Sequence, residues 1–163
     1  MLPDFLAQNL SVIFCGTAAG KESAAVGHYY ARPGNRFWKT IYTIGITDRL
    51  LRAEDDRECL SYGFGFTDLA KGVSGMDQDI AKHAFEPKNV HAIIGNYRPR
   101  AIAFNGKRAA QIALNEKVVT YGLWKTDGLT SIWIMPSTSG AANRYWSLSP
   151  WEDLAKFVRS AQP

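Results

Sequence analysis

The chain has 163 residues, of which 46% are hydrophobic and 12% aromatic, and its 19 Lys and Arg against 15 Asp and Glu give a net charge of +4. This length allows one well-formed core and excludes two domains of ordinary size, so we expect one domain over residues 1–163. The mild positive charge suits a polyanionic partner without requiring one.

The cysteine count and the hydropathy pattern disfavour two further classes of protein. Cys15 and Cys59 form no CxxC pair and are too few for a structural zinc site or an iron-sulfur cluster. No apolar run reaches membrane-spanning length, and the N-terminus lacks a signal-peptide pattern. We therefore expect a cytoplasmic protein that needs no metal or cofactor.

The first half of the chain predicts one strand and one helix. Residues 12–15 are apolar on both faces and end at Gly16, as in strands buried within a parallel sheet. Residues 37–44 form one apolar helical stripe, with Asn35 as the predicted cap and Gly45 as the predicted end.

The second half repeats a strand-turn-helix pattern. Helices are predicted where apolar residues recur at helical spacing, and strands where short apolar runs end in turn residues. The Asp127-Gly128 pair predicts a tight turn between residues 121–125 and the last strand. The predicted elements are helix 89–97, strand 101–104, helix 108–114, strand 131–135 and, after the Ser149-Pro150 start signal, helix 151–158.

This alternation predicts an α/β fold, a three-layer α/β/α sandwich around a central, mostly parallel sheet. Ligands of such sheets bind outside the carboxyl ends of the strands. The functional loops should therefore be the segments that follow the strands, at residues 16–35, 63–72, 105–108 and 135–144.

The turn "GTAAG" at residues 16–20 is neither a P-loop nor a GxGxxG motif, and its small residues fit close backbone approach or simple packing equally well. The aromatic pair Tyr29 and Tyr30 follows it, and the later "MPSTSG" offers hydroxyls and amides suited to phosphate groups. The combination points to a nucleotide or a flipped base.

Several blocks, in order, resemble the mismatch-specific uracil and thymine DNA glycosylases of the uracil-DNA glycosylase superfamily. They are "VIFCGTAAG", "PGNRFWK", "IYTIGITDR", "GFT", "YRPRAIAFNGK" and "MPSTS". The resemblance implies hydrolysis of the N-glycosidic bond of uracil flipped out of double-stranded DNA, which leaves an abasic site. It implies a monofunctional enzyme, acting on the DNA of a bacterial-type nucleoid, and we expect a monomer.

The resemblance also assigns roles to residues of the base pocket. Tyr30 matches the aromatic residue that stacks on the flipped base, and Ser23 the residue that crowds its C5 position. Asn35 matches an Asn that orders the pocket loop. Gly16, Thr17 and Ala18 lie where backbone and neighbouring groups bind the base edge.

The same resemblance implies that residues Ser137, Thr138, Ser139 and Gly140 grip DNA phosphates and enter the gap left by the base. Relatives fill this gap with an apolar residue or an Arg, and Arg144 is the residue we expect to do so here. Lys39 is a further predicted phosphate contact, although such charges are commonly solvated surface groups.

The turn departs from the family at one chemical point. Relatives typically read "GINPG" and use its Asn to position the attacking water. This chain has Ala18 instead, whose methyl group can neither orient nor activate water. Asp68, His28 and Thr17 are therefore the candidate catalytic residues. Asp68 could equally cap a turn, and His28 could be a hydrogen-bonded loop residue.

Three other functions stay open. Loss of the Asn could leave a protein that binds damaged or abasic DNA with little or no cleavage, or the enzyme could act on other deaminated bases. A domain that binds small nucleotides is the third alternative, and the steep salt dependence of DNA binding would distinguish it.

Overall fold

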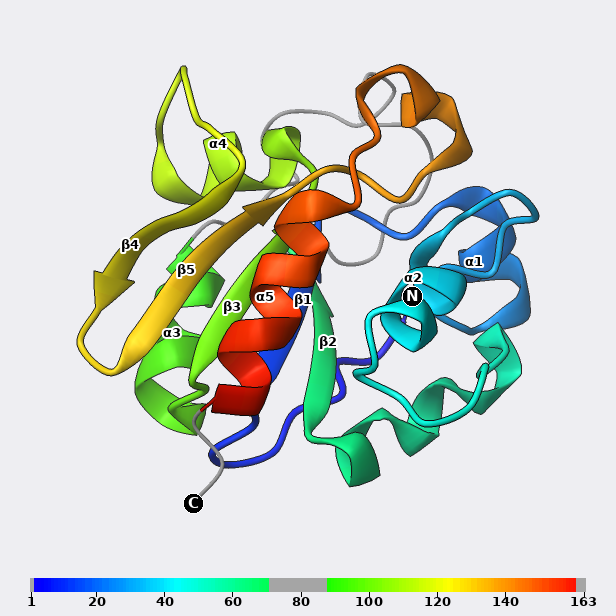
Figure 1. Cartoon of the computed structure of the whole chain (residues 1–163), viewed down its shortest axis with the longest axis horizontal. Helices are drawn as coiled ribbons and strands as arrows, with labels where there is room; N and C mark the ends of the chain where they lie inside the picture. The colour runs from blue at the N-terminus through cyan, green and yellow to red at the C-terminus, as the bar shows by residue number, and fades with distance from the viewer. Residues whose placement is uncertain (1, 71–87, 161–163) are drawn as a thin grey trace.

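The computed structural model describes residues 2–70 and 88–160, and its centre is a five-stranded sheet (Figure 1). The strand order is β2-β1-β3-β5-β4, in which β1 pairs in parallel with β2 and β3, and β3 with β5. Only β4 runs antiparallel to its neighbour β5. The strands are β1 (Val12–Gly16), β2 (Phe64–Asp68), β3 (Ala101–Asn105), β4 (Gly122–Asp127) and β5 (Thr130–Met135).

Helices cover both faces of this sheet, which confirms the predicted three-layer α/β/α fold. Figure 1 shows α5 crossing in front of the sheet, with α3 behind it. The helices of the described residues are α1 (Lys21–Val26), α2 (Phe37–Thr43), α3 (Lys88–Tyr97), α4 (Lys107–Leu114) and α5 (Ser149–Ser160), and the same residues include the 3-10 segments η1 (Ala53–Tyr62) and η4 (Gly140–Tyr145).

The strands supply two cores because successive side chains point to opposite faces of a sheet. Val12 and Phe14 of β1 pack with α2 and α5 on one face. Ile13 and Cys15 of the same strand pack with α3 and α4 on the other. All five residues of β1 are buried, as its continuous apolar run predicts.

Aromatic packing accounts for much of the aromatic content of the chain. Phe14 stacks on the fully buried Trp151 with ring centroids 5.8 Å apart, and Phe37 meets Phe14 edge to face at 5.0 Å. The indole of Trp151 also donates a hydrogen bond to the Pro136 carbonyl at 3.1 Å. This bond ties α5 to the loop that leaves β5, so the core also positions a functional loop.

The structure corrects the predicted loops in three places. Segment 63–72 contains β2, segment 16–35 contains α1, and segment 135–144 runs into η4. Residues 71 and 72 of the first segment lie outside the part that the structure describes. The other predicted strands and helices are confirmed, with boundaries that shift by one to a few residues.

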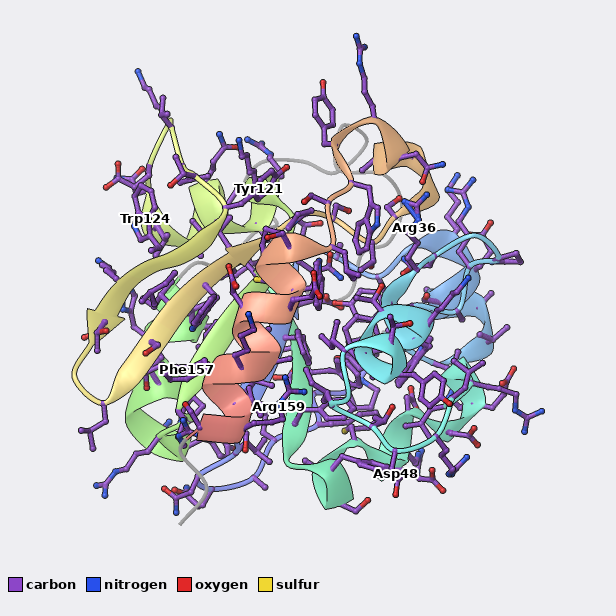
Figure 2. The ribbon with its side chains drawn as sticks, in the orientation of Figure 1. Arg36, Asp48, Tyr121, Trp124, Phe157 and Arg159 are labelled. Carbon is purple, nitrogen blue, oxygen red and sulfur yellow. The ribbon has the colours of Figure 1, made fainter. Side chains whose placement is uncertain are left out.

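The parallel register brings the ends of the strands to one edge of the sheet. Gly16 pairs with Asp68, and Asn105 pairs with Met135, so β1, β2, β3 and β5 all end at the same level. Figure 2 shows Tyr121 and Arg36 at this end of the molecule. Over residues 2–70 and 88–160, the structure contains no helix that is both long and apolar enough to cross a membrane.

Candidate active site

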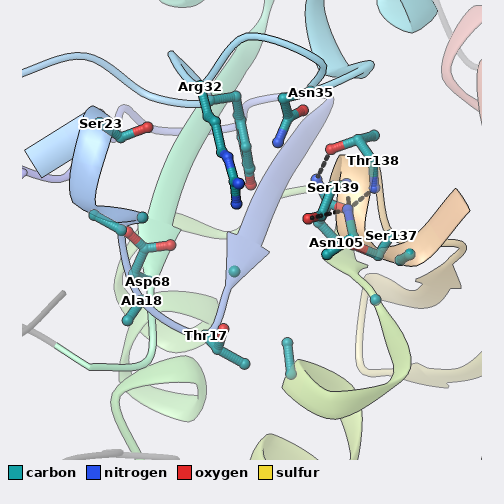
Figure 3. A pocket seen from close by; sticks show the side chains of 18 of the residues that line it. Thr17, Ala18, Ser23, Arg32, Asn35, Asp68, Asn105, Ser137, Thr138 and Ser139 are labelled. Atoms are coloured by element: carbon teal, nitrogen blue, oxygen red, sulfur yellow. Dashed lines mark hydrogen bonds between the residues drawn. The ribbon is translucent and has the colours of Figure 1, made fainter. Parts of the chain in front are cut away.

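A cavity of about 760 Å³ lies at the carboxyl ends of the strands, where the sequence predicts the ligand site (Figure 3). Its wall comes from the turn after β1, the loop before α2, the ends of β2 and β3, and the loop after β5. Residues far apart in the sequence therefore meet around one space. The residues around it include Gly16, Tyr30, Arg32, Asp68, Asn105 and Thr138.

Asp68 and Gly16 form one part of this wall, at the ends of the paired strands β2 and β1. Asp68 is only 6% exposed. A Cβ atom on Gly16 would lie 2.7 Å from Asp68 Oδ1. Only glycine therefore leaves room for the carboxylate in this position, and a carboxylate buried in a cavity is a typical acid or base in catalysis.

Tyr30 lines the cavity, and its aromatic ring stacks on Phe37. The two rings stack with centroids 4.4 Å apart and an interplanar angle of 21°. Tyr30 also has a positive φ of 52°, which is uncommon for a bulky residue and is typical of functional sites. A planar ligand in the cavity could extend the stack of two rings.

The hydroxyl of Tyr30 lies inside the protein. It makes no hydrogen bond of ordinary geometry with the residues in 2–70 and 88–160, although the nearby Asn105 side chain acts to lower its pKa. Burial, and next the charge of Asp68, raise the pKa of Tyr30 well above its ordinary value. The phenol is therefore a neutral group that keeps its proton beside the carboxylate.

Asn105 holds the loop that follows β5. Its Nδ2 donates to Thr138 Oγ1 at 2.9 Å, and its Oδ1 accepts from the Thr138 N–H at 3.0 Å (Figure 3). The Thr138 carbonyl in turn accepts from the Arg36 N–H at 2.8 Å. Thr138 is therefore fixed between β3 and the loop before α2, and it connects two walls of the cavity.

The rim of the cavity is mostly positive and partly aromatic. Lys21, Lys107 and Arg108 line it and are exposed, and the Lys107 ammonium lies 4.5 Å from the ring centre of Tyr121. Tyr145 of η4 also lines the cavity and is 64% exposed. Cationic and aromatic groups around a cavity suit a nucleic acid strand.

A sequence profile of the Uracil DNA glycosylase superfamily matches residues 3–161 of this chain. The chain belongs to the uracil DNA glycosylase superfamily. Membership supports DNA glycosylase activity, the hydrolysis of the bond between a base and its deoxyribose, with DNA as the substrate.

The fold agrees with that of a solved structure. A candidate uracil DNA glycosylase from Methanosarcina acetivorans, whose solution structure was determined by NMR, superposes with a TM-score of 0.64. The two sequences are 21% identical over 97% of this chain and 96% of the other. At this identity the likeness shows the shared architecture.

Most of the residues that the superfamily resemblance singled out lie around the cavity. They are Gly16, Thr17, Ala18, Ser23, Tyr30, Asn35, Asp68, Ser137, Thr138 and Ser139. Asn35 Oδ1 accepts from the N–H of Phe37, the first residue of α2, at 3.0 Å. Ser23 Oγ accepts from the Ala31 N–H at 2.9 Å, so this hydroxyl holds the loop that carries Tyr30.

Four predicted residues do not line the cavity: His28, Lys39, Gly140 and Arg144. His28 Nδ1 lies 3.2 Å from Asp56 Oδ1, and Asp56 is fully buried and also accepts from the Tyr29 N–H. This contact gives His28 a structural partner away from the cavity. Lys39 and Arg144 are exposed outside it, and Gly140 packs near the Gly34 carbonyl.

Three residues of this superfamily member were missed from the sequence as individual site residues: Arg32, Asn105 and Tyr145. A single Asn after a strand does not reveal a partner 33 positions away, and Tyr145 lies beyond the motif that drew attention to its loop. Arg32 stands between the motifs for Tyr30 and Asn35. Its place two residues after Tyr30 and three before Asn35 was the one available signal.

The described part of the chain contains no group of three or more His, Cys, Asp or Glu side chains arranged to hold a metal ion.

Proposed function

We propose that the protein is a monofunctional glycosylase that hydrolyses the N-glycosidic bond of uracil flipped out of DNA and leaves an abasic site. The observation that carries the proposal is the pairing, in one cavity, of a buried carboxylate, Asp68, with an aromatic ring, Tyr30, that is stacked on Phe37. The carboxylate suits the sugar and a water molecule, and the aromatic ring suits the base.

The reaction develops positive charge on the sugar and negative charge on the departing base. A carboxylate near the sugar stabilises the positive charge and can accept a proton from the attacking water. Asp68 is the group for this role, because Ala18 has no polar side chain to position water. Thr17 lines the same turn and offers its hydroxyl and its backbone groups.

Phosphates of the damaged strand would bind at the loop of Ser137, Thr138 and Ser139. Two of these side chains already organise the loop: Ser137 Oγ accepts from the Ser139 N–H at 3.2 Å, and Thr138 is held by Asn105. A loop fixed before binding loses little conformational freedom on contact with DNA. The cationic rim would add affinity that falls with salt.

The test is incubation of the purified protein with labelled DNA that carries uracil opposite G, opposite A or in a single strand, followed by alkaline cleavage at abasic sites. We expect cleavage of uracil DNA and none of the matched thymine DNA. No cleavage in any of the three contexts would contradict the proposal. Borohydride should trap no covalent complex, and a trapped complex would contradict monofunctional action.

A second function has one observation in its favour, the methyl group of Ala18 in the turn where relatives place a water-positioning amide. The protein would then bind damaged or abasic DNA without cleaving it. Tight binding to an abasic duplex together with no base release would establish this alternative. A panel of deaminated bases in the same assay separates uracil from other substrates.

A further inference from the structure

Arg32 is a cationic side chain of the cavity that the proposed chemistry has not yet used. Figure 3 shows it extending from the loop before α2 toward the end of β1. Its backbone is held on both sides: the Ala31 N–H donates to Ser23 Oγ at 2.9 Å, and the Arg32 carbonyl accepts from the Asn35 N–H at 3.0 Å. The origin of the side chain is therefore fixed beside Tyr30.

The guanidinium has only a weak anionic partner. Its Nε lies 3.8 Å from Glu22 Oε1, and the side chains of Arg32 and Glu22 are 55% and 50% exposed. Ion pairs this exposed contribute little, because water screens them and two long side chains must be ordered. Arg32 can therefore leave Glu22 for a ligand at little cost.

The charges of the cavity match the charges that the reaction develops. Asp68, at the end of β2, supplies a negative group for the sugar. Arg32, from a different wall of the same cavity, supplies a positive group two residues along the chain from Tyr30, on whose ring the base would stack. Arginine presents several N–H donors in a rigid fork, which suits the adjacent oxygen and nitrogen atoms of a pyrimidine anion.

We propose that Arg32 is a catalytic residue that donates hydrogen bonds to the departing base and stabilises its negative charge; this inference rests on the proposed function above. The bond between the sugar C1′ and the base nitrogen breaks, and its electron pair stays on the base. Water adds to the sugar cation and gives a proton to the Asp68 carboxylate. The base leaves as an anion paired with Arg32.

The first test compares two leaving groups in single-turnover excision at saturating protein. Arg32→Ala should slow release of uracil on the order of 100-fold, as loss of a preorganised donor does. Release of 5-fluorouracil should slow much less, because fluorine already stabilises the anion. The rate of uracil release by Arg32→Lys should lie between those of the wild type and Arg32→Ala. Lys156→Ala, which removes an exposed charge on α5, should match the wild type. Equal losses for both bases would overturn the proposal.

A phosphate contact is the competing role for Arg32, and binding separates it from catalysis. If Arg32 acts on the base, Arg32→Ala should bind a duplex with a reduced abasic site as tightly as the wild type, with the same salt dependence. If Arg32 holds a phosphate, affinity falls and the slope of log K against log salt drops by about one. Lower affinity and a smaller salt slope in Arg32→Ala, together with wild-type excision rates at saturation, would overturn the proposal.

A measurement without turnover keeps the inference separate from the proposed function. Free 5-fluorouracil is titrated into the complex of protein and abasic duplex as the pH is raised and the base ionises. Affinity should rise with pH in the wild type and stay flat in Arg32→Ala. A flat wild-type response would overturn the role of Arg32. Absence of base release, with this response intact, would contradict only the glycosylase activity.

Discussion

The carboxylate of Asp68 occupies the space where Gly16 would carry a side chain. A Cβ atom at position 16 would lie 2.7 Å from Asp68 Oδ1 and 3.6 Å from the Tyr30 hydroxyl. The backbone of Gly16 does not have the positive φ that favours glycine elsewhere in this chain. Glycine stands here because of the space that the two neighbouring side chains fill.

Gly16→Ala should therefore displace Asp68 and lower the rate of base excision at least tenfold, with about 1 to 3 kcal/mol of overpacking cost in stability. The matched control is Gly95→Ala, since a Cβ atom on this α3 residue would meet nothing within 4 Å. The control should retain full activity and gain about 0.5 to 1 kcal/mol. Single-turnover rates and urea unfolding measure both effects. Wild-type excision by Gly16→Ala would show that the position of Asp68 is unimportant.

Replacement of Asp68 tests its charge. Asp68→Asn and Asp68→Ala should both slow excision on the order of 100-fold or more, because neither can accept a proton or stabilise the sugar cation. Adding Ala18→Asn to Asp68→Asn should recover part of the loss, since the amide could position water. Near wild-type rates in both single variants would remove Asp68 from the mechanism.

Tyr30 should act through its ring. Tyr30→Ala should weaken binding to a duplex with an uncleavable uracil analogue by about 1 to 3 kcal/mol, the usual effect of losing one stacked aromatic residue. Tyr30→Phe keeps the stack on Phe37 and removes only a buried hydroxyl, so its affinity should stay close to that of the wild type. Equal losses in both variants would assign the role to the hydroxyl instead.

Stability should fall in alkali because of Cys59. Burial, and then the charge of Asp56, raise the pKa of this thiol from 9.0 to about 12. The unfolded chain loses the proton above pH 9 and the folded chain keeps it, so the stabilising contribution is complete below pH 9 and is lost as the pH rises toward 12. Urea unfolding between about pH 8 and about pH 10 should show a shallower decline for Cys59→Ala than for the wild type. Parallel declines would contradict this.

Strong periodicity made most of the fold predictable. The buried strand β1 and the amphipathic helices carry their pattern in adjacent residues, so the sequence predicts them well. β2 was missed because Gly65 interrupts its pattern, and that glycine exists for a tertiary reason: a Cβ atom there would collide with the Phe5 carbonyl. α1 was also missed, because it has only six residues and no side-chain cap.

The candidate site was predictable to the extent that each residue sits in its own motif. The parallel register of β1 and β2 brings Gly16 and Asp68 together, and the loop before α2 adds Tyr30 to the same cavity. The contact of His28 with Asp56 joins residues 28 positions apart through a 3-10 segment that carries no catalytic motif. Such pairings depend on the packed structure, and local pattern does not encode them.

The contact between Phe5 and β2 has a consequence for self-association. Phe5 exchanges two backbone hydrogen bonds of 3.0 Å with Phe66, and this single bridge covers part of the outer edge of β2. Exposed strand edges invite pairing with strands of other molecules. A Cβ atom at position 65 would lie 2.2 Å from the Phe5 carbonyl oxygen, so Gly65 helps to keep this part of the β2 edge paired within the chain and unavailable to another strand.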